Sequence, residues 1–247
     1  MKLNLKNSLV VLYAFVSVVL TLPMMIPAGI MMLFGYNKLA FRYLNYIGKE
    51  YAKLFFFVIH STVTVIGLEN LPASNNICFV SNHQSLMDIP LITGYIPKTV
   101  GFIAKKELAR IPIMNIWLRA LNCVMIDRSN PRATIKTIER SIRHIQKGHA
   151  MVIFPEGTRS RGHEMLKFKP GAFKLVSGAD SYAVPLTIDN TYKILEDTGT
   201  ITSTAVTLTI HKAIDVKQLS SDEKAQLHVV IEATVKSGLT TPPVSSR

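Results

Sequence analysis

Hydrophobic and polar positions divide the chain into two regions with different patterns. Residues 7–37 contain no charged side chain, and this stretch is longer than the roughly 20 residues that a helix needs to cross a bilayer. After His60, short apolar runs alternate with amphipathic segments, which is typical of a layered α/β domain. The pattern predicts a membrane-associated two-helix motif over residues 1–60 and an α/β domain over residues 61–247.

Within the second region, short apolar runs predict strands and the amphipathic segments between them predict helices. The best-marked helix begins at Pro131 after the cap Asn130, repeats isoleucine on one face and stops at Gly148. We expect a mixed, mainly parallel sheet flanked by helices. The predicted strands are residues 62–66, 77–80, 100–104, 123–126, 151–154, 182–188 and 205–211, and the predicted helices begin near Ser85, Ile111, Pro131, Pro170 and Ser220.

The first region resembles a hairpin that enters one leaflet. Pro23 and Pro27 interrupt the apolar stretch, and lysines flank both of its ends, which frustrates the charge rule for a single crossing. Residues 39–60 alternate basic and aromatic residues at helical spacing, as an interfacial helix does, with Tyr43, Tyr46 and Tyr51 at headgroup depth. Two re-entrant helices with both termini in the cytoplasm are predicted. A full span by the first segment and a cleaved signal peptide are the alternatives, although a signal core of about 7 to 15 residues is shorter.

The charge balance calls for an anionic partner. The chain has 28 Lys and Arg against 16 Asp and Glu, a net charge of +12 and a pI near 9.7. The mean hydropathy of +0.26 favours a membrane surface over nucleic acid, and neither an aromatic-interleaved basic helix nor a zinc-finger spacing is present. Cys78 and Cys123 lie in apolar runs and predict core residues, not a disulfide.

A polar corner after the strand at residues 77–80 carries His83 and, five residues on, Asp88. Side chains five residues apart on one helix point about 140° apart, so these two can touch only across a turn. Ser85 followed three residues later by an acid indicates a helix start at that turn. A carboxylate there can hold one imidazole nitrogen and leave the other as a base. A surface histidine beside an acid that complements the helix dipole is the alternative.

Cations follow two other predicted strands. Glu156 lies between Pro155 and Gly157 in a tight loop after residues 151–154, and the planar guanidinium of Arg159 suits a phosphate. Lys105 follows residues 100–104, and strand ends should converge at one sheet edge. A base beside a phosphate clamp predicts transfer to or from a phosphorylated alcohol. A surface ion pair and a solvated lysine are the alternatives.

Four ordered blocks carry a family resemblance. Residues 82–88 (NHQSLMD), 105–112 (KKELARIP), 154–160 (FPEGTRS) and 184–188 (VPLTI) resemble the blocks of the glycerolipid acyltransferases, most closely the bacterial 1-acylglycerol-3-phosphate acyltransferases. Asn115 stands where the family often has Gly, and Leu186-Thr187 where it has Val-Ala, which affects the expected shape of the acyl pocket.

The resemblance implies lysophosphatidic acid as acceptor, a thioester of acyl carrier protein or coenzyme A as donor, and phosphatidic acid as product. It implies His83 as base with Asp88 as its partner, Lys105 and Arg159 on the acceptor phosphate, and Glu156 on the glycerol side. No further cofactor, metal or nucleic acid is expected. The enzyme is expected at the cytoplasmic face of the cell membrane, where its acceptor lies.

The chemistry supports the same reaction. A thiol leaving group has a pKa of about 8.5, whereas an alcohol lies close to the roughly 15.7 of water, so deprotonating the alcohol limits the reaction. One histidine supplies about 10²- to 10⁴-fold for that step, and direct attack needs no serine or cysteine nucleophile. Backbone amides near Gly157 are the predicted donors to the oxyanion.

Three other functions fit parts of the sequence. Acceptors such as glycerol 3-phosphate or a lysophospholipid with a larger headgroup use the same blocks. A membrane-bound phosphate-ester hydrolase fits less well, because His163-Glu164 lacks a second histidine at helical spacing. A lipid-binding protein without catalysis would not need His83.

Overall fold

The computed structural model describes residues 21–127 and 131–240 and contains one mixed sheet. Within these residues eight strands pair, seven of them in the order β1-β7-β6-β2-β5-β3-β4, while β8 pairs with β6. The strands are β1 Thr62–Ile66, β2 Ile77–Ser81, β3 Val100–Lys105, β4 Val124–Ile126, β5 Ala150–Ile153, β6 Tyr182–Asp189, β7 Ala205–Ile210 and β8 Ile214–Asp215.

Most neighbouring strands run parallel. β2 is central, between β5 and β6, and pairs parallel with both; β3 is parallel to β5 and β4. The pairs β6–β7 and β6–β8 are antiparallel, and β1 is parallel to β7. The predicted mixed, mainly parallel sheet is therefore confirmed, and the carboxyl ends of β2, β3 and β5 meet at one edge as expected.

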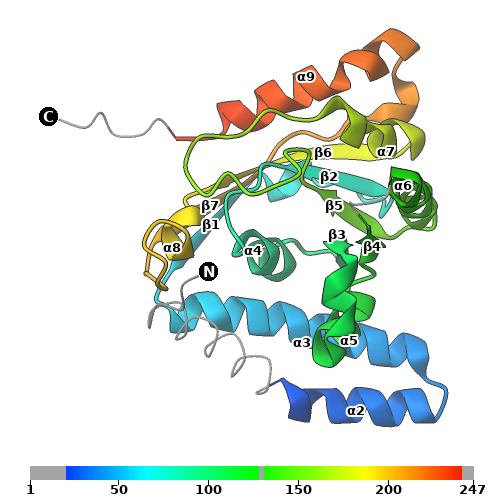
Figure 1. Ribbon diagram of the computed structural model, residues 1–247, viewed down its shortest axis with the longest axis vertical. Helices are drawn as coiled ribbons and strands as arrows, with labels where there is room; N and C mark the ends of the chain where they lie inside the picture. Colours follow the sequence, from blue (N-terminus) through cyan, green and yellow to red (C-terminus); the bar gives the residue numbers. More distant parts are fainter. Residues whose placement is uncertain (1–20, 128–130, 241–247) are drawn as a thin grey trace, which may run out of the picture.

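Alternating side chains along β2 supply both faces of the sheet. Ile77 and Phe79 belong to one buried cluster, and Cys78 and Val80 to another, so every residue of this strand is buried. Helices α3 (Asn37–Val58) and α4 (Asp88–Tyr95) cover the first face. Helices α6 (Pro131–Gln146), α7 (Phe173–Gly178) and α9 (Ser221–Ser237) cover the second (Figure 1). The result is a three-layered domain with the core on both sides of β2.

Helix boundaries follow the local sequence signals in part. Ser220 caps α9 in a capping box with Glu223, as predicted. Helix α4 begins at Asp88 and not near Ser85, which corrects the predicted start. Asn130, the predicted cap of α6, lies outside the described residues. Further elements are α5 (Pro112–Ala120), α8 (Tyr192–Leu195) and the 3-10 turns Leu68–Asn70, Lys106–Arg110, Pro170–Ala172 and Val216–Gln218; neither α8 nor β8 was predicted.

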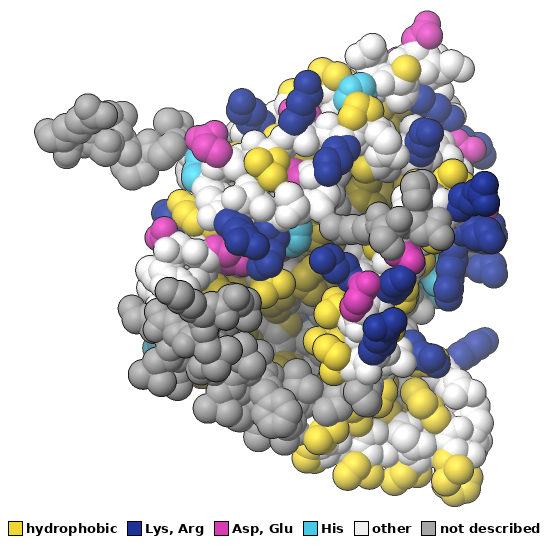
Figure 2. Space-filling view, in the orientation of Figure 1, with side chains coloured by type: hydrophobic (Ala, Val, Ile, Leu, Met, Phe, Trp, Pro, Cys, Tyr) yellow, Lys and Arg dark blue, Asp and Glu magenta, His cyan; other side chains and the backbone are white. Residues whose placement is uncertain are grey.

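Helix α6 has a charged outer face. Ile145 is buried and Ile138 and Ile142 pack against the second cluster, but Ile135 is 58% exposed and leaves the predicted apolar stripe. Figure 2 shows Lys and Arg side chains gathered over this helix, at the right of the view. The exposed cations are Arg132, Lys136, Arg140, Arg143 and Lys147.

Helices α2 (Leu22–Leu33) and α3 form a hairpin below the domain (Figure 1). Small residues let them approach closely, because Ala28 and Ala40 are both buried in their contact. Their outer surface is apolar, with Leu33 83% and Phe57 77% exposed (Figure 2). None of the helices in the described ranges combines the length and apolar character that a bilayer crossing needs. The structure thus contains a helix pair in this region, and its re-entrant insertion into one leaflet stays a prediction.

The predicted division at residue 60 stays a prediction. Phe56 near the end of α3 is fully buried in the same cluster as Phe79 of β2, so this helix shares the core of the sheet. The first 14 residues of the predicted apolar stretch, residues 7–20, lie outside the described part of the chain.

Candidate active site

His83 and Asp88 meet across the turn between β2 and α4. His83 Nδ1 lies 2.7 Å from Asp88 Oδ2, which also accepts from the amides of Gln84 and Ser85 at 2.8 and 3.0 Å. The other oxygen, Oδ1, accepts the hydroxyl of Thr191. Asp88 is fully buried, and its four partners fix the carboxylate in one place. The predicted contact is confirmed.

This contact decides which ring nitrogen can act as a base. A carboxylate at Nδ1 favours the tautomer that carries its proton there, so the lone pair lies on Nε2. The ring stacks on Phe154, with centroids 4.0 Å apart, and Phe154 stacks in turn on Phe102 of β3. This stacking holds the imidazole ring in place. The His83 side chain is still 17% exposed, so it can be reached from outside.

The loop after β5 is hydrogen-bonded to the histidine loop. The amide of Ser160 donates to the carbonyl of His83 at 2.8 Å, and the amide of Arg161 donates to Gln84 at 3.2 Å. Glu156 Oε1 accepts from the amide of His83 at 2.7 Å. Two blocks about 70 residues apart thus form one unit. The sequence predicted that they meet at one sheet edge but not that these hydrogen bonds join them.

Glu156 points into the protein. Its exposed fraction is 2%, and its second oxygen accepts from the amide of Leu166 at 3.0 Å. Desolvation raises the pKa of this carboxyl to about 7, with smaller contributions from the charges of Asp88 and Glu232; the two amide bonds act in the opposite direction. These contacts place Glu156 beneath the loop, where it positions the backbone of His83.

Arg159 is held by an acid that the sequence analysis missed. Its guanidinium donates to Glu196 Oε1 at 2.9 Å, and Glu196 also accepts from the amide of Leu86 and the hydroxyl of Ser85. The side chain of Glu196 is 5% exposed, and this residue directly follows the short helix α8. The Ser85 hydroxyl donates to Glu196 and also accepts from the amide of Met87 at 3.0 Å, while the amide of Ser85 donates to Asp88, so the predicted capping-box-like contacts are present in part. No motif marks Glu196, because its partners lie 37 to 111 residues away.

The two adjacent lysines have different environments. Lys105 lies at the carboxyl end of β3, is exposed, and its side chain makes no hydrogen bond or ion pair within residues 21–127 and 131–240. The amine of Lys106 is bonded to Asp127. Lys105 therefore shares the sheet edge with the histidine loop, as predicted, although no described contact joins its side chain to Arg159.

Gly157 allows a tight turn and the close approach of a further cation. Its φ is +74°, and a Cβ there would lie 2.7 Å from Lys169 Nζ. The amide of Gly157 donates to the carbonyl of Phe154 at 3.0 Å. This amide is therefore engaged, which corrects the part of the oxyanion prediction that rests on Gly157 itself. Lys169 was not predicted, since nothing in the sequence distinguishes it from Lys167.

The assembled groups suit proton abstraction beside a phosphate. One edge of the sheet carries an oriented imidazole, its buried carboxylate and the cations Lys105, Arg159 and Lys169. Within the described ranges, no group of three or more His, Cys, Asp or Glu side chains could hold a metal ion.

Known proteins share this arrangement of blocks and fold. A family model described as "Acyltransferase" matches residues 62–189. A 1-acyl-sn-glycerol-3-phosphate acyltransferase of Borreliella burgdorferi is 32% identical over 181 residues, 72% of each chain. A chloroplastic relative from Brassica napus is 32% identical over 173 residues, and a second comes from Arabidopsis thaliana. The chain spans about half the length of these two plant relatives.

A solved structure matches over almost the whole length. The crystal structure of the 1-acyl-sn-glycerophosphate (LPA) acyltransferase of Thermotoga maritima has a TM-score of 0.77 to this chain at 31% identity. The alignment covers 94% of this chain and 96% of the other.

Proposed function

The chain belongs to the acyltransferase family, among the 1-acyl-sn-glycerol-3-phosphate acyltransferases that its sequence blocks predicted, and from this premise we propose its reaction. It transfers a fatty acyl group from a thioester to the free sn-2 hydroxyl of lysophosphatidic acid and forms phosphatidic acid. The thioester is that of acyl carrier protein or coenzyme A. The contact between His83 Nδ1 and Asp88 is the observation that carries the proposal, because it leaves Nε2 as the base.

In the proposed mechanism, Nε2 of His83 takes the proton of the acceptor hydroxyl as its oxygen attacks the thioester carbonyl. The C–S bond breaks when the tetrahedral intermediate collapses, and the thiolate receives the proton from the imidazolium. Asp88 stays ionised and stabilises the imidazolium. The donor to the oxyanion is sought among the loop amides other than that of Gly157.

Direct transfer without an acyl-enzyme is consistent with the two cysteines. Burial raises the pKa of the Cys123 thiol to about 11, against a smaller opposite effect of a hydrogen bond with the backbone of Phe102, and burial also raises the pKa of Cys78. Only a thiolate is an effective nucleophile, and burial disfavours it at both positions.

We assign the acceptor phosphate to Lys105 and Arg159. Arg159 uses one amino group for Glu196, which orients the guanidinium and leaves its other N–H groups for the ligand. Glu156 acts through the backbone of His83 and not on the glycerol, since both of its oxygens accept buried amides.

The helix pair α2–α3 is proposed to contact the cytoplasmic leaflet, where the acceptor lies. Exposed apolar side chains support this, because patches of this kind mark a membrane or a partner. The most exposed of these side chains are Leu33, Phe34 and Phe57, with exposed fractions of 83%, 70% and 77%.

The test is acyl transfer from a labelled thioester to lysophosphatidic acid by the purified protein. His83→Ala should lower the rate by about 10² to 10⁴-fold, and Asp88→Ala should also lower it. His149→Ala, an exposed histidine in another part of the molecule, is the matched control. Normal product from His83→Ala would show that His83 is not the base. No product from the wild-type protein would favour a lipid-binding protein, and faster transfer to glycerol 3-phosphate would change the acceptor.

A further inference from the structure

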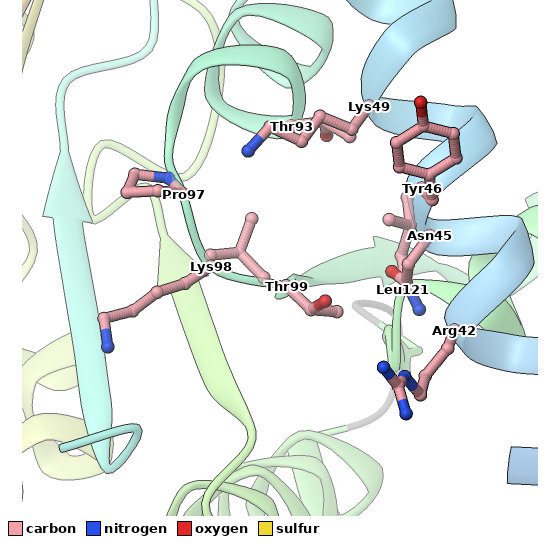
Figure 3. A pocket seen from close by; sticks show the side chains of 10 residues that line it. Arg42, Asn45, Tyr46, Lys49, Thr93, Pro97, Lys98, Thr99 and Leu121 are labelled. Carbon is pink, nitrogen blue, oxygen red and sulfur yellow. The ribbon is translucent and has the colours of Figure 1, made fainter. Parts of the chain in front are cut away.

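A cavity of about 270 Å³ lies away from His83, at the opposite end of the sheet. It is formed by α3, the segment that joins α4 to β3, and Leu121 after α5 (Figure 3). Val100, the first residue of β3, lines it, whereas the proposed active site follows the last residues of the parallel strands. The cavity is therefore distinct from the acceptor site.

Two cations of α3 line this cavity without a carboxylate partner. Arg42 and Lys49 are seven residues apart, which places them on one helix face roughly 10 Å apart along the axis. Neither side chain makes an ion pair in the described part of the chain, and the nearby Glu50 is bonded to Lys53 at 3.0 Å. In Figure 3 both side chains extend beside the opening between α3 and residues 97–99, which join α4 to β3.

The charge of Lys49 is uncompensated. Burial lowers the pKa of its ammonium, the positive charge of Lys53 lowers it further, and Glu50 acts in the opposite direction. Lys98 also lines the cavity, but its amine donates to the carbonyl of Ser74 and to Asn75 at 3.0 and 3.1 Å, so it contributes charge from a distance. An anion in the cavity would supply the missing partner.

A buried hydroxyl adds a donor. Thr93 lines the cavity, and its Oγ1 atom is buried with no hydrogen-bond partner in the residues that the structure describes. Buried hydroxyls usually have a partner, so this one has a hydrogen bond to offer to a ligand that reaches it. A hydroxyl, a guanidinium and an ammonium around one space suit a ligand with several acceptor oxygens and negative charge, as a phosphate group has.

We propose that this cavity binds the phosphate group of an anionic phospholipid of the surrounding leaflet, at a site separate from that of the acceptor. A lipid is favoured over free phosphate because the same helix carries the exposed apolar residues Leu39, Phe41 and Tyr46. The choice of a lipid rests on the proposed membrane contact of α3, which it deepens, but binding itself can be measured without a bilayer.

Calorimetric titration with the water-soluble lipid dihexanoylphosphatidic acid tests the site. The background is Arg159→Gln, so that the acceptor site contributes little. Arg42→Gln with Lys49→Gln should weaken binding at least tenfold. The matched control is Lys38→Gln with Lys136→Gln, which removes two exposed charges outside the cavity and should leave binding unchanged.

Three further arms fix the ligand and its place. Trp117, the sole tryptophan, packs beside Gly48, and its fluorescence should change when the lipid binds. Inorganic phosphate and dihexanoylphosphatidylcholine should bind more weakly. If free phosphate binds equally well, the claim that the ligand is a lipid is wrong. If the zwitterionic lipid binds equally well, the claim that the site selects an anionic headgroup is wrong.

Binding that disappears with Arg159→Gln alone, or survives the Arg42 and Lys49 substitutions, would overturn the site itself. Failure of the proposed function would appear elsewhere, as a wild-type protein that transfers no acyl group. A protein that transfers acyl groups but fails the titration would overturn only the lipid site.

Discussion

The carboxyl edge of the sheet and the α2–α3 face differ in whether their charged side chains have partners within the protein. At the sheet edge, the buried carboxylates of Asp88, Glu156 and Glu196 all have partners within the protein. On α3, Arg42 and Lys49 have no carboxylate partner in the described chain, and large apolar side chains are exposed. The carboxylates of the first region are thus held within the protein, whereas the second region presents cations and apolar side chains that we propose to meet a lipid surface.

This difference matters for catalysis. Groups that are already oriented need no reorganisation when the transition state forms, so the imidazole can act as soon as the acceptor arrives. The α2–α3 face, in contrast, is the surface that we propose to contact the lipid. Changes at the sheet edge should therefore alter turnover, and changes at the helices should alter recruitment.

The largest effect is expected for Asp88→Asn. The imidazole would lose the negative charge that stabilises its protonated form. An amide nitrogen in the place of Oδ2 would also face the backbone donors of Gln84 and Ser85. The corresponding change in a serine-protease triad costs about 10⁴-fold, and we expect a fall in kcat of at least about 10²-fold here. Stability should drop by about 1–3 kcal/mol.

Steady-state kinetics and thermal unfolding measure both effects of Asp88→Asn. Asp222→Asn, an exposed acid in the first turn of α9, is the control. A kcat within a few-fold of wild type would show that Asp88 does not orient the base.

A smaller effect, on acceptor binding, is expected for Glu196→Gln. The substitution removes the charge that orients Arg159 but keeps one acceptor oxygen. KM for lysophosphatidic acid should rise by about tenfold with a smaller change in kcat, in line with the loss of one charge-assisted bond. Glu164→Gln, whose side chain is 90% exposed, is the control. An unchanged KM with reduced kcat would place Glu196 in the catalytic step instead.

Recruitment should depend on Leu33 and Phe57. Burying such a side chain contributes about 1.5–3 kcal/mol, so Leu33→Ser with Phe57→Ser should weaken binding to anionic vesicles by at least about tenfold. Val229→Ser with Val230→Ser removes two half-exposed side chains from α9 and is the matched control. Equal flotation of both variants with vesicles would argue against contact through α2–α3.

The last prediction concerns the pH dependence of stability. A carboxyl whose pKa rises from 4.5 to about 7 on folding binds more protons in the folded state between these values. Its contribution to stability is therefore greatest below about pH 4.5 and is lost as the pH rises to 7, by on the order of 3 kcal/mol. Glu156→Gln should flatten this slope in denaturant titrations at several pH values. An identical slope in both proteins would mean that folding does not shift the pKa of Glu156.

The sequence predicted what local pattern determines. Short apolar runs such as residues 77–80 are typical of buried strands in a layered domain, and the five-residue spacing of His83 and Asp88 required a turn. Long-range contacts were not predictable. Ser85 makes the local contacts of a helix start, but its hydroxyl also donates to Glu196, which lies 111 residues further along the chain. The two-residue β8 is too short to leave a pattern.

A single-turnover experiment most directly tests the claim that the acyl group passes straight from the thioester to the acceptor, with His83 as the base. The wild-type protein is mixed with equimolar labelled acyl thioester, with and without lysophosphatidic acid, and quenched on the millisecond scale. The account predicts that thiol is released only when the acceptor is present, at the rate at which phosphatidic acid appears, and that no label stays on the protein. Thiol release without the acceptor, with label bound covalently to the protein and transferred on later addition of lysophosphatidic acid, would contradict it.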